Sequence, residues 1–202
     1  KMWFNASRPI LRLANQHPQF RFLATTSNQV KRPFPEQTVP PKNAADADKA
    51  PNKIAIITGA SSGIGMECAV VFSDLGWEVH NISRKPCPVD GVISHSADLT
   101  SVTEATRVGN IIAEHLSKRT SKSLISIIHN AAMFNDDRAD HKFNADHMQK
   151  AFNLSVIAPG LLNARVLPSM AAGSSIVFIG STLSEQAVAG RASYVTTKHA
   201  VI

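Results

Sequence analysis

A tyrosine and a lysine near the end of the sequence, Tyr194 and Lys198 in Y-V-T-T-K, could carry out proton transfer. Residues four apart on a helix project from the same face, so this spacing places an ammonium beside a phenol. A phenol has an ordinary pKa of about 10, and a nearby cation favours the phenolate. The hydroxyl could then exchange a proton with a substrate oxygen near neutral pH. The same two residues also fit an ordinary amphipathic helix without chemistry.

A glycine-rich segment, T-G-A-S-S-G-I-G at Thr58 to Gly65, follows a short run of β-branched apolar residues. The run Lys53 to Thr58 predicts a buried parallel strand, and apolar residues at helical spacing predict a helix from about Ile64. Glycines between a strand and a helix allow a tight turn, and the helix N-terminus can then bind a pyrophosphate. A turn that binds nothing is the alternative, but the order of strand, glycines and helix favours a dinucleotide site.

Taken together, the motifs between residues 52 and 202 resemble those of the short-chain dehydrogenase/reductase superfamily. Thr58 to Gly65 matches the family's cofactor loop, Asp98-Leu99-Thr100 matches its adenine-contacting motif, and His129-Asn130-Ala131-Ala132 stands where N-N-A-G is usual. The cofactor-binding residues that this resemblance implies are Thr58, Gly59, Ser61, Ser62, Gly63, Ile64, Gly65, Asp98, Leu99, Asn130, Ala131, Tyr194 and Lys198.

The resemblance also implies a catalytic group for hydride transfer between a nicotinamide cofactor and a carbonyl or alcohol carbon. Tyr194 would donate a proton to the substrate oxygen, and Lys198 would lower the pKa of Tyr194 and hold the ribose. Ser181 would donate a hydrogen bond to the carbonyl oxygen, and Asn153 would position a relay water. The substrate stays open among 3-oxoacyl thioesters, steroids, sugars and small aldehydes.

Two differences from the family pattern concern residues and length. His129 replaces the first Asn and Ala132 the Gly, and we expect function to survive both. The sequence stops four residues after Lys198, whereas family members continue through further strands and a substrate lid. We therefore expect a C-terminally truncated domain, and an inactive NADP-binding fragment is the alternative to an active reductase. We expect the full-length form to be a homo-oligomer.

The choice of cofactor depends on the end of the second predicted strand, Trp77 to Ser83, which continues into Arg84 and Lys85. An acidic residue here would hold the ribose hydroxyls of NAD, whereas an Arg accommodates the 2′-phosphate of NADP. The guanidinium of Arg84 matches phosphate geometry. The sequence therefore predicts NADP(H), with NAD(H) less favoured, although a solvated basic turn is the alternative.

Strand and helix patterns alternate through the rest of residues 52–202. Further strands are expected at about 92–95, 124–128 and 175–179, with a helix at 102–116 and one or two helices between 144 and 168. This order predicts an α/β fold with a doubly wound, Rossmann-like parallel sheet, incomplete at the C-terminus.

The first 50 residues hold eight Lys and Arg against three Asp and Glu, whereas the remainder holds thirteen against twelve. Residues 1–35 are Arg-rich and contain no acidic residue, which predicts a mitochondrial transit peptide. The alternative is a basic tail without a targeting function, in a cytoplasmic protein. Residues 36–51 read as a linker. The near-neutral domain argues against nucleic-acid binding, and no transmembrane run is present. We expect a small-molecule substrate as the partner.

No metal site is expected. His141 and His147 lie among aspartates, but their spacing does not place them on one helical face. Real ligand motifs bring their donors together at shorter helical spacings.

Overall fold

The computed structural model describes residues 52–134 and 136–202. The predicted transit peptide and linker lie outside these residues. Five parallel strands form one sheet in the order β3-β2-β1-β4-β5. The strands are β1 (Lys53–Thr58), β2 (Glu78–Ser83), β3 (Ile93–Ser96), β4 (Leu124–His129) and β5 (Ser175–Phe178). The predicted α/β class with a doubly wound parallel sheet is confirmed, and each predicted strand agrees with its observed bounds within one residue.

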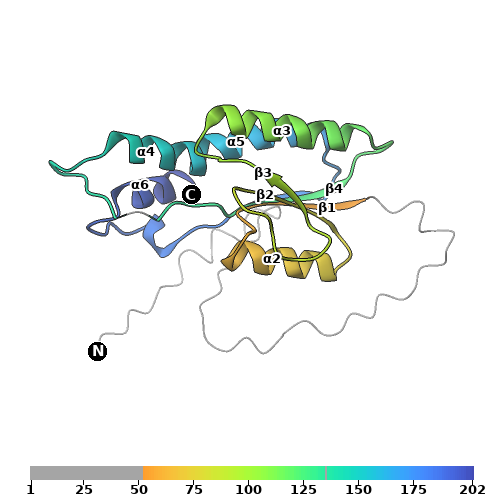
Figure 1. Cartoon of the computed structure of the whole chain (residues 1–202), viewed down its shortest axis with the longest axis horizontal. Coiled ribbons are helices and arrows are strands. Elements are labelled where there is room, and N and C mark those ends of the chain that lie inside the picture. Colours follow the sequence, from red (N-terminus) through yellow and green to blue (C-terminus); the bar gives the residue numbers. More distant parts are fainter. Residues whose placement is uncertain (1–51, 135) are drawn as a thin grey trace, which may run out of the picture. The chain divides into compact units, whose positions relative to one another are not determined.

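Helices cover both faces of the sheet, with α2 (Gly63–Asp74) on one face and α3 (Val102–Ser117) and α5 (Ala158–Val166) on the other (Figure 1). The alternation of side chains along β1 explains the two apolar cores. Ile54 and Ile56 pack with α3 and α5, whereas Ala55 and Ile57 pack on the α2 side. Both faces of β1 are buried, so its sequence is a continuous apolar run.

The segment predicted as one or two helices between residues 144 and 168 contains two. Helix α4 (Ala145–Phe152) continues through a π-helical turn, η1 (Asn153–Ile157), into α5. Pro159 lies in the first turn of α5, where a missing N–H is tolerated. The chain then forms a 3₁₀ turn, η2 (Leu167–Ser169), before β5.

The last elements are a 3₁₀ turn, η3 (Thr182–Ser184), and helix α6 (Ala192–Ala200), which packs against it. Strand β5 lies at an edge of the described sheet and pairs there only with β4. Its apolar residues Ile176, Val177 and Phe178 are 36–40% exposed. Within residues 52–134 and 136–202, no helix is long and apolar enough to cross a membrane.

Candidate dinucleotide-binding and catalytic site

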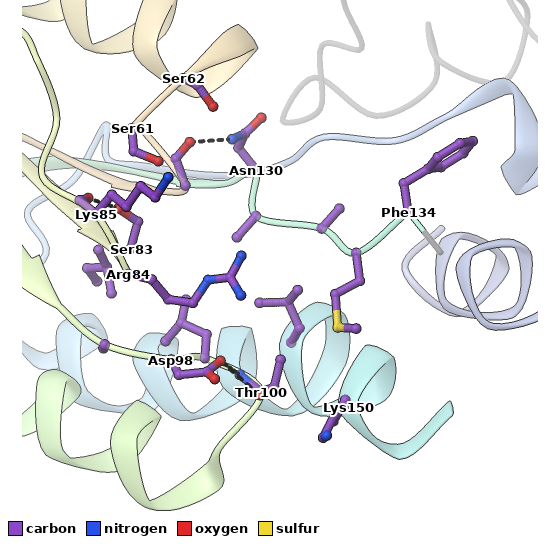
Figure 2. Close-up of a pocket in the computed structure, with 18 of the residues that line it drawn as sticks. Ser61, Ser62, Ser83, Arg84, Lys85, Asp98, Thr100, Asn130, Phe134 and Lys150 are labelled. Carbon is purple, nitrogen blue, oxygen red and sulfur yellow. Dashed lines mark hydrogen bonds between the residues drawn. The ribbon is translucent and has the colours of Figure 1, made fainter. Parts of the chain in front are cut away.

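A cleft of about 1200 Å³ opens where β1, β2 and β4 end (Figure 2). Ligands of open parallel sheets bind at this edge, outside the carboxyl ends of the strands. Many of the predicted cofactor residues line it: Gly59, Ser61, Ser62, Ile64, Arg84, Asp98, Leu99, Asn130 and Ala131. The structure therefore gathers residues from four separate loops around one cavity.

Five predicted cofactor residues do not line this cleft: Tyr194 and Lys198, which lie on α6, and Thr58, Gly63 and Gly65, which shape its wall. Gly59 and Gly63 have φ values of 75° and 58°, a backbone region that favours glycine. A Cβ on Gly65 would lie 2.5 Å from both the side-chain nitrogen of Asn130 and the carbonyl oxygen of Gly59. The glycine at position 65 is therefore required for the close approach between the loop and α2.

The N-terminus of α2 opens toward the cleft. Its N-cap residue, Ser62, lines the cavity and makes no capping hydrogen bond from its side chain. The first N–H groups of a helix have no partner within the helix, and they carry a partial positive charge. This end of α2 therefore fits an anionic pyrophosphate.

The ends of β1 and β4 are joined by hydrogen bonds between Thr58 and Asn130. The Asn130 and Ala131 amides both donate to the Thr58 hydroxyl at 3.0 Å, and the Asn130 side chain donates to the Thr58 and Gly59 carbonyls. Thr58 is buried. These two residues fix the glycine loop in place.

Asn81 is a supporting residue that the motifs do not reveal. It is completely buried in β2, and its side-chain oxygen accepts a hydrogen bond from the Ala60 amide at 3.0 Å. Its amide nitrogen donates to the Ser83 and Ser94 hydroxyls and to the Lys85 carbonyl. Asn81 thus ties the glycine loop to the turn that carries Arg84. Strand β2 also contains Glu78, His80 and Ser83, so the presence of a polar residue in this strand did not single out Asn81.

Four charged side chains line the same cleft: Arg84, Lys85, Asp98 and Lys150 (Figure 2). Arg84 points into the cavity and makes no hydrogen bond to another described residue. The Thr100 amide and hydroxyl donate to Asp98 at 3.0 and 2.8 Å. These hydrogen bonds, with the charges of Arg84 and Lys150, lower the pKa of Asp98 below its usual value. The cleft therefore combines a fixed carboxylate with a cation that is available to a ligand.

Tyr194 and Lys198 lie on α6, with the Lys198 ammonium 5.6 Å from the centre of the Tyr194 ring. The Tyr194 ring also meets Phe134, which lines the cleft, edge to face at 4.9 Å. Lys198 is buried and donates a hydrogen bond to the Ile179 carbonyl. Its burial lowers its pKa. The predicted pair is therefore adjacent, but the ammonium contacts the end of β5 rather than the large cleft.

The other two predicted catalytic residues are held by nearby backbone. Ser181 caps η3, its hydroxyl accepting from the Leu183 amide at 3.1 Å. The Asn153 side chain donates to the Thr100 carbonyl at 2.8 Å and accepts from Gln149 at 2.9 Å. Asn153 begins the π-helical turn, a feature that is frequent at functional sites. Among the described residues, no hydrogen bond joins Ser181 or Asn153 to Tyr194 or Lys198.

His129, one of the two departures from the family pattern, is buried at the end of β4. Its Nε2 lies 2.8 Å from the Asn163 side-chain oxygen, and its ring packs on Phe178. Its burial lowers its pKa, so the ring is neutral and donates to Asn163. His129 therefore makes a polar contact between β4 and α5.

A model of the short chain dehydrogenase family matches residues 53–202. Benzil reductase ((S)-benzoin forming) of Bacillus subtilis is 27% identical over 151 residues, covering 72% of this chain and 62% of that protein. Protein FixR of Bradyrhizobium diazoefficiens is 29% identical over 193 residues, covering 86% of this chain and 68% of that protein. The chain thus spans about three fifths to two thirds of the length of these relatives.

Solved structures agree with this match. A short-chain dehydrogenase/reductase from Burkholderia vietnamiensis superposes with a TM-score of 0.65 at 22% identity, covering 75% of this chain and 73% of that one. A 4-hydroxyisoleucine dehydrogenase complexed with NADH gives a TM-score of 0.62 at 25% identity, covering 74% and 65%. The motifs, the strand order and the family match together establish that this chain belongs to the short-chain dehydrogenase/reductase family.

Proposed function

We propose that this protein is an NADP(H)-dependent reductase that transfers a hydride between the cofactor and a carbonyl or alcohol carbon. The observation that carries the proposal is the cleft, where the open N-terminus of α2 and the side chain of Arg84 face one cavity. The N-terminus of α2 fits a pyrophosphate, and the Arg84 guanidinium fits a further phosphate. The close approach at Gly65 leaves no space for a side chain and supports the same assignment.

The loop from Gly59 to Gly65 would hold the pyrophosphate, and Asp98 and Leu99 would contact the adenine. When bound, the reduced nicotinamide supplies a hydride to the carbonyl carbon and is oxidised. Tyr194 donates its proton to the carbonyl oxygen, so the product is an alcohol. Ser181 donates a hydrogen bond to that oxygen and orients the substrate. Lys198 favours the phenolate that Tyr194 becomes. Asn153 positions a relay water through which Tyr194 regains its proton.

Carbonyl-dependent oxidation of NADPH tests the proposed reaction. Benzil is the first substrate to try, because the Bacillus subtilis relative is a benzil reductase. Small ketones and aldehydes should be tried beside it. We expect loss of NADPH absorbance only when a carbonyl is present, with an equal amount of alcohol formed. Binding of NADPH without turnover on any carbonyl would instead favour the alternative, a cofactor-binding chain without activity.

Arg84 should determine the preference between the two cofactors. We expect the protein to bind NADPH at least tenfold more tightly than NADH, and Arg84→Asp should remove or reverse that preference, because a carboxylate repels the 2′-phosphate and accepts hydrogen bonds from ribose hydroxyls. Calorimetric titration of both variants with both cofactors measures the effect. Lys118→Asp changes the net charge equally at an exposed position just after the C-terminal end of α3, and it should leave the preference intact. Equal affinities in the unaltered protein would exclude the role given to Arg84.

We also propose that residues 2–35 direct the protein to mitochondria. A fluorescent reporter fused behind this segment should accumulate in mitochondria. Changing Arg8, Arg12 and Arg21 to Glu should abolish import, whereas changing them to Lys, which retains the charge, should preserve it. A cytosolic reporter carrying the unaltered segment would support the cytoplasmic alternative.

A further inference from the structure

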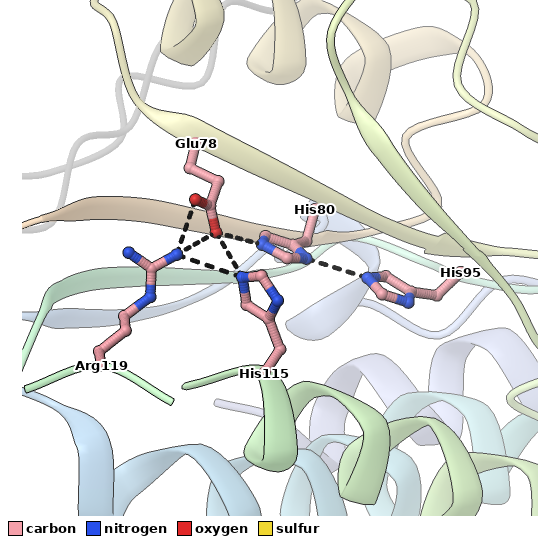
Figure 3. Close-up of polar contacts among 5 residues, drawn as sticks. All are labelled: Glu78, His80, His95, His115 and Arg119. Carbon is pink, nitrogen blue, oxygen red and sulfur yellow. Dashed lines mark hydrogen bonds and ion pairs between the residues drawn. The ribbon is translucent and has the colours of Figure 1, made fainter. Parts of the chain in front are cut away.

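A second polar cluster lies far from the cofactor cleft (Figure 3). Glu78 is the first residue of β2, whereas Ser83, its last, lines the cleft. The two residues are five positions apart along the strand, a distance of roughly 16 Å. Glu78 and His80 project from the same face of β2, and His115 and Arg119 reach them from the end of α3. Neither the proposed reaction nor the cofactor uses this group.

Three potential metal-binding atoms converge here. The Nε2 atoms of His80 and His115 each lie 2.8 Å from Oε1 of Glu78, and the three atoms all lie within 4.8 Å of one another. Ligands about 2.0–2.1 Å from a tetrahedral zinc ion are about 3.3 Å apart, so each His nitrogen needs to move away from the Glu78 oxygen by only about half an ångström. Two imidazoles with one carboxylate form a familiar zinc donor set.

His95 on β3 contacts the other ring nitrogen of His80. Its Nε2 lies 2.9 Å from Nδ1 of His80, and His80 is almost fully buried. If His80 donates its Nδ1 proton to His95, its Nε2 lone pair faces Glu78 and His115. Metal-binding histidines are typically oriented in this way by a hydrogen bond on the opposite ring nitrogen.

Arg119 supplies the positive charge in this structure, and its fit is imperfect. One guanidinium nitrogen lies 2.6 Å from Oε1 of Glu78 and 3.2 Å from Nε2 of His115. His115 cannot both accept a hydrogen bond from Arg119 and donate one to Glu78 through the same nitrogen. In addition, the Nε of Arg119 is buried without a partner among the described residues. A compact divalent ion would satisfy all three converging lone pairs, and Arg119 could then turn toward solvent.

We propose that Glu78, His80 and His115 form a binding site for a divalent transition-metal ion, with Zn²⁺ as the first choice, which binds in place of the Arg119 guanidinium. The ion joins the start of β2 to the end of α3 and leaves a fourth coordination position for water. Because the site lies at the opposite end of β2 from the cleft, its occupancy stabilises the domain and does not change cofactor affinity.

Titration of the chelator-treated full chain with Zn²⁺ tests the proposal. We expect one ion per chain, and Arg119→Gln should bind it at least tenfold more tightly because the competing cation is removed. His115→Ala should bind at least tenfold more weakly. His141→Ala, which removes a highly exposed histidine elsewhere, should bind like the unaltered protein. Zn²⁺ should raise the melting temperature of the unaltered chain and of His141→Ala, but not that of His115→Ala.

Circular dichroism of each variant establishes that it is folded, and Glu78→Gln replaces His115→Ala if that variant does not fold. The visible spectrum of bound Co²⁺ should be that of a four-coordinate ion. Three results would each overturn the proposal: no stoichiometric binding to the unaltered chain, no gain in affinity for Arg119→Gln, or an equal loss for His115→Ala and His141→Ala.

Discussion

Replacing Tyr194 with Phe should lower turnover by a factor of about 10² to 10⁴, the usual contribution of general acid catalysis. The substitution removes one hydroxyl and keeps the ring that packs edge to face on Phe134. NADPH affinity should therefore change by less than about threefold, which is under 1 kcal/mol. Steady-state kinetics with benzil and calorimetric titration with NADPH measure the two effects separately.

Lys198→Ala provides the comparison for Tyr194→Phe. It removes a buried cation that contacts both the Tyr194 ring and the Ile179 carbonyl. Both turnover and cofactor affinity should fall, because Lys198 is assigned two roles: it holds the cofactor ribose and it lowers the pKa of Tyr194. If Tyr194→Phe retained full turnover, Tyr194 would not be the proton donor.

Gly65→Ala should cost about 1–3 kcal/mol of stability, as overpacking typically does. It should also weaken NADPH binding at least tenfold. The added Cβ would lie 2.5 Å from the Gly59 carbonyl oxygen and from the Asn130 side chain, so the glycine loop must shift. Urea unfolding measures the first effect and calorimetric titration the second.

Gly160→Ala is the matched control for Gly65→Ala. Gly160 lies in α5, and a Cβ there would meet nothing within 4 Å. Alanine is favoured over glycine in helices by about 1 kcal/mol, so this variant should be equally or more stable and should bind NADPH normally. An unchanged affinity in Gly65→Ala would mean that the loop does not hold the cofactor.

The sequence predicted the sheet well because local pattern and tertiary environment agree along it. In β1 the run from Lys53 to Thr58 is apolar on both faces, and helices do bury both faces. The glycine motif likewise predicted the loop after β1, because positive φ at Gly59 and Gly63 and the close approach at Gly65 each require that residue type.

The supporting polar contacts could not be predicted in the same way. Asn81 and Ala60 are 21 residues apart in the sequence, and their hydrogen bond depends on the parallel pairing of β1 and β2. The cluster of Glu78 and His115 spans 37 residues and two elements. Alternation in β2 does place Glu78 and His80 on one face, but only the packing of α3 brings His115 to them.

The directions of individual side chains could not be predicted from the motif either. The Y-x-x-x-K spacing correctly places Tyr194 and Lys198 side by side on α6. It does not determine that the Lys198 ammonium contacts the Ile179 carbonyl, because that depends on how α6 packs against the end of β5. The π-helical turn at Asn153 was similarly missed, since its residues fit an ordinary helical pattern.

A crystal structure of the protein with NADP⁺ bound tests the central claim most directly. The pyrophosphate should lie against the N-terminal amides of α2, the adenine beside Asp98 and Leu99, and the 2′-phosphate within hydrogen-bonding distance of the Arg84 guanidinium. A cofactor bound elsewhere on the domain, or a 2′-phosphate that does not contact Arg84, would contradict the account.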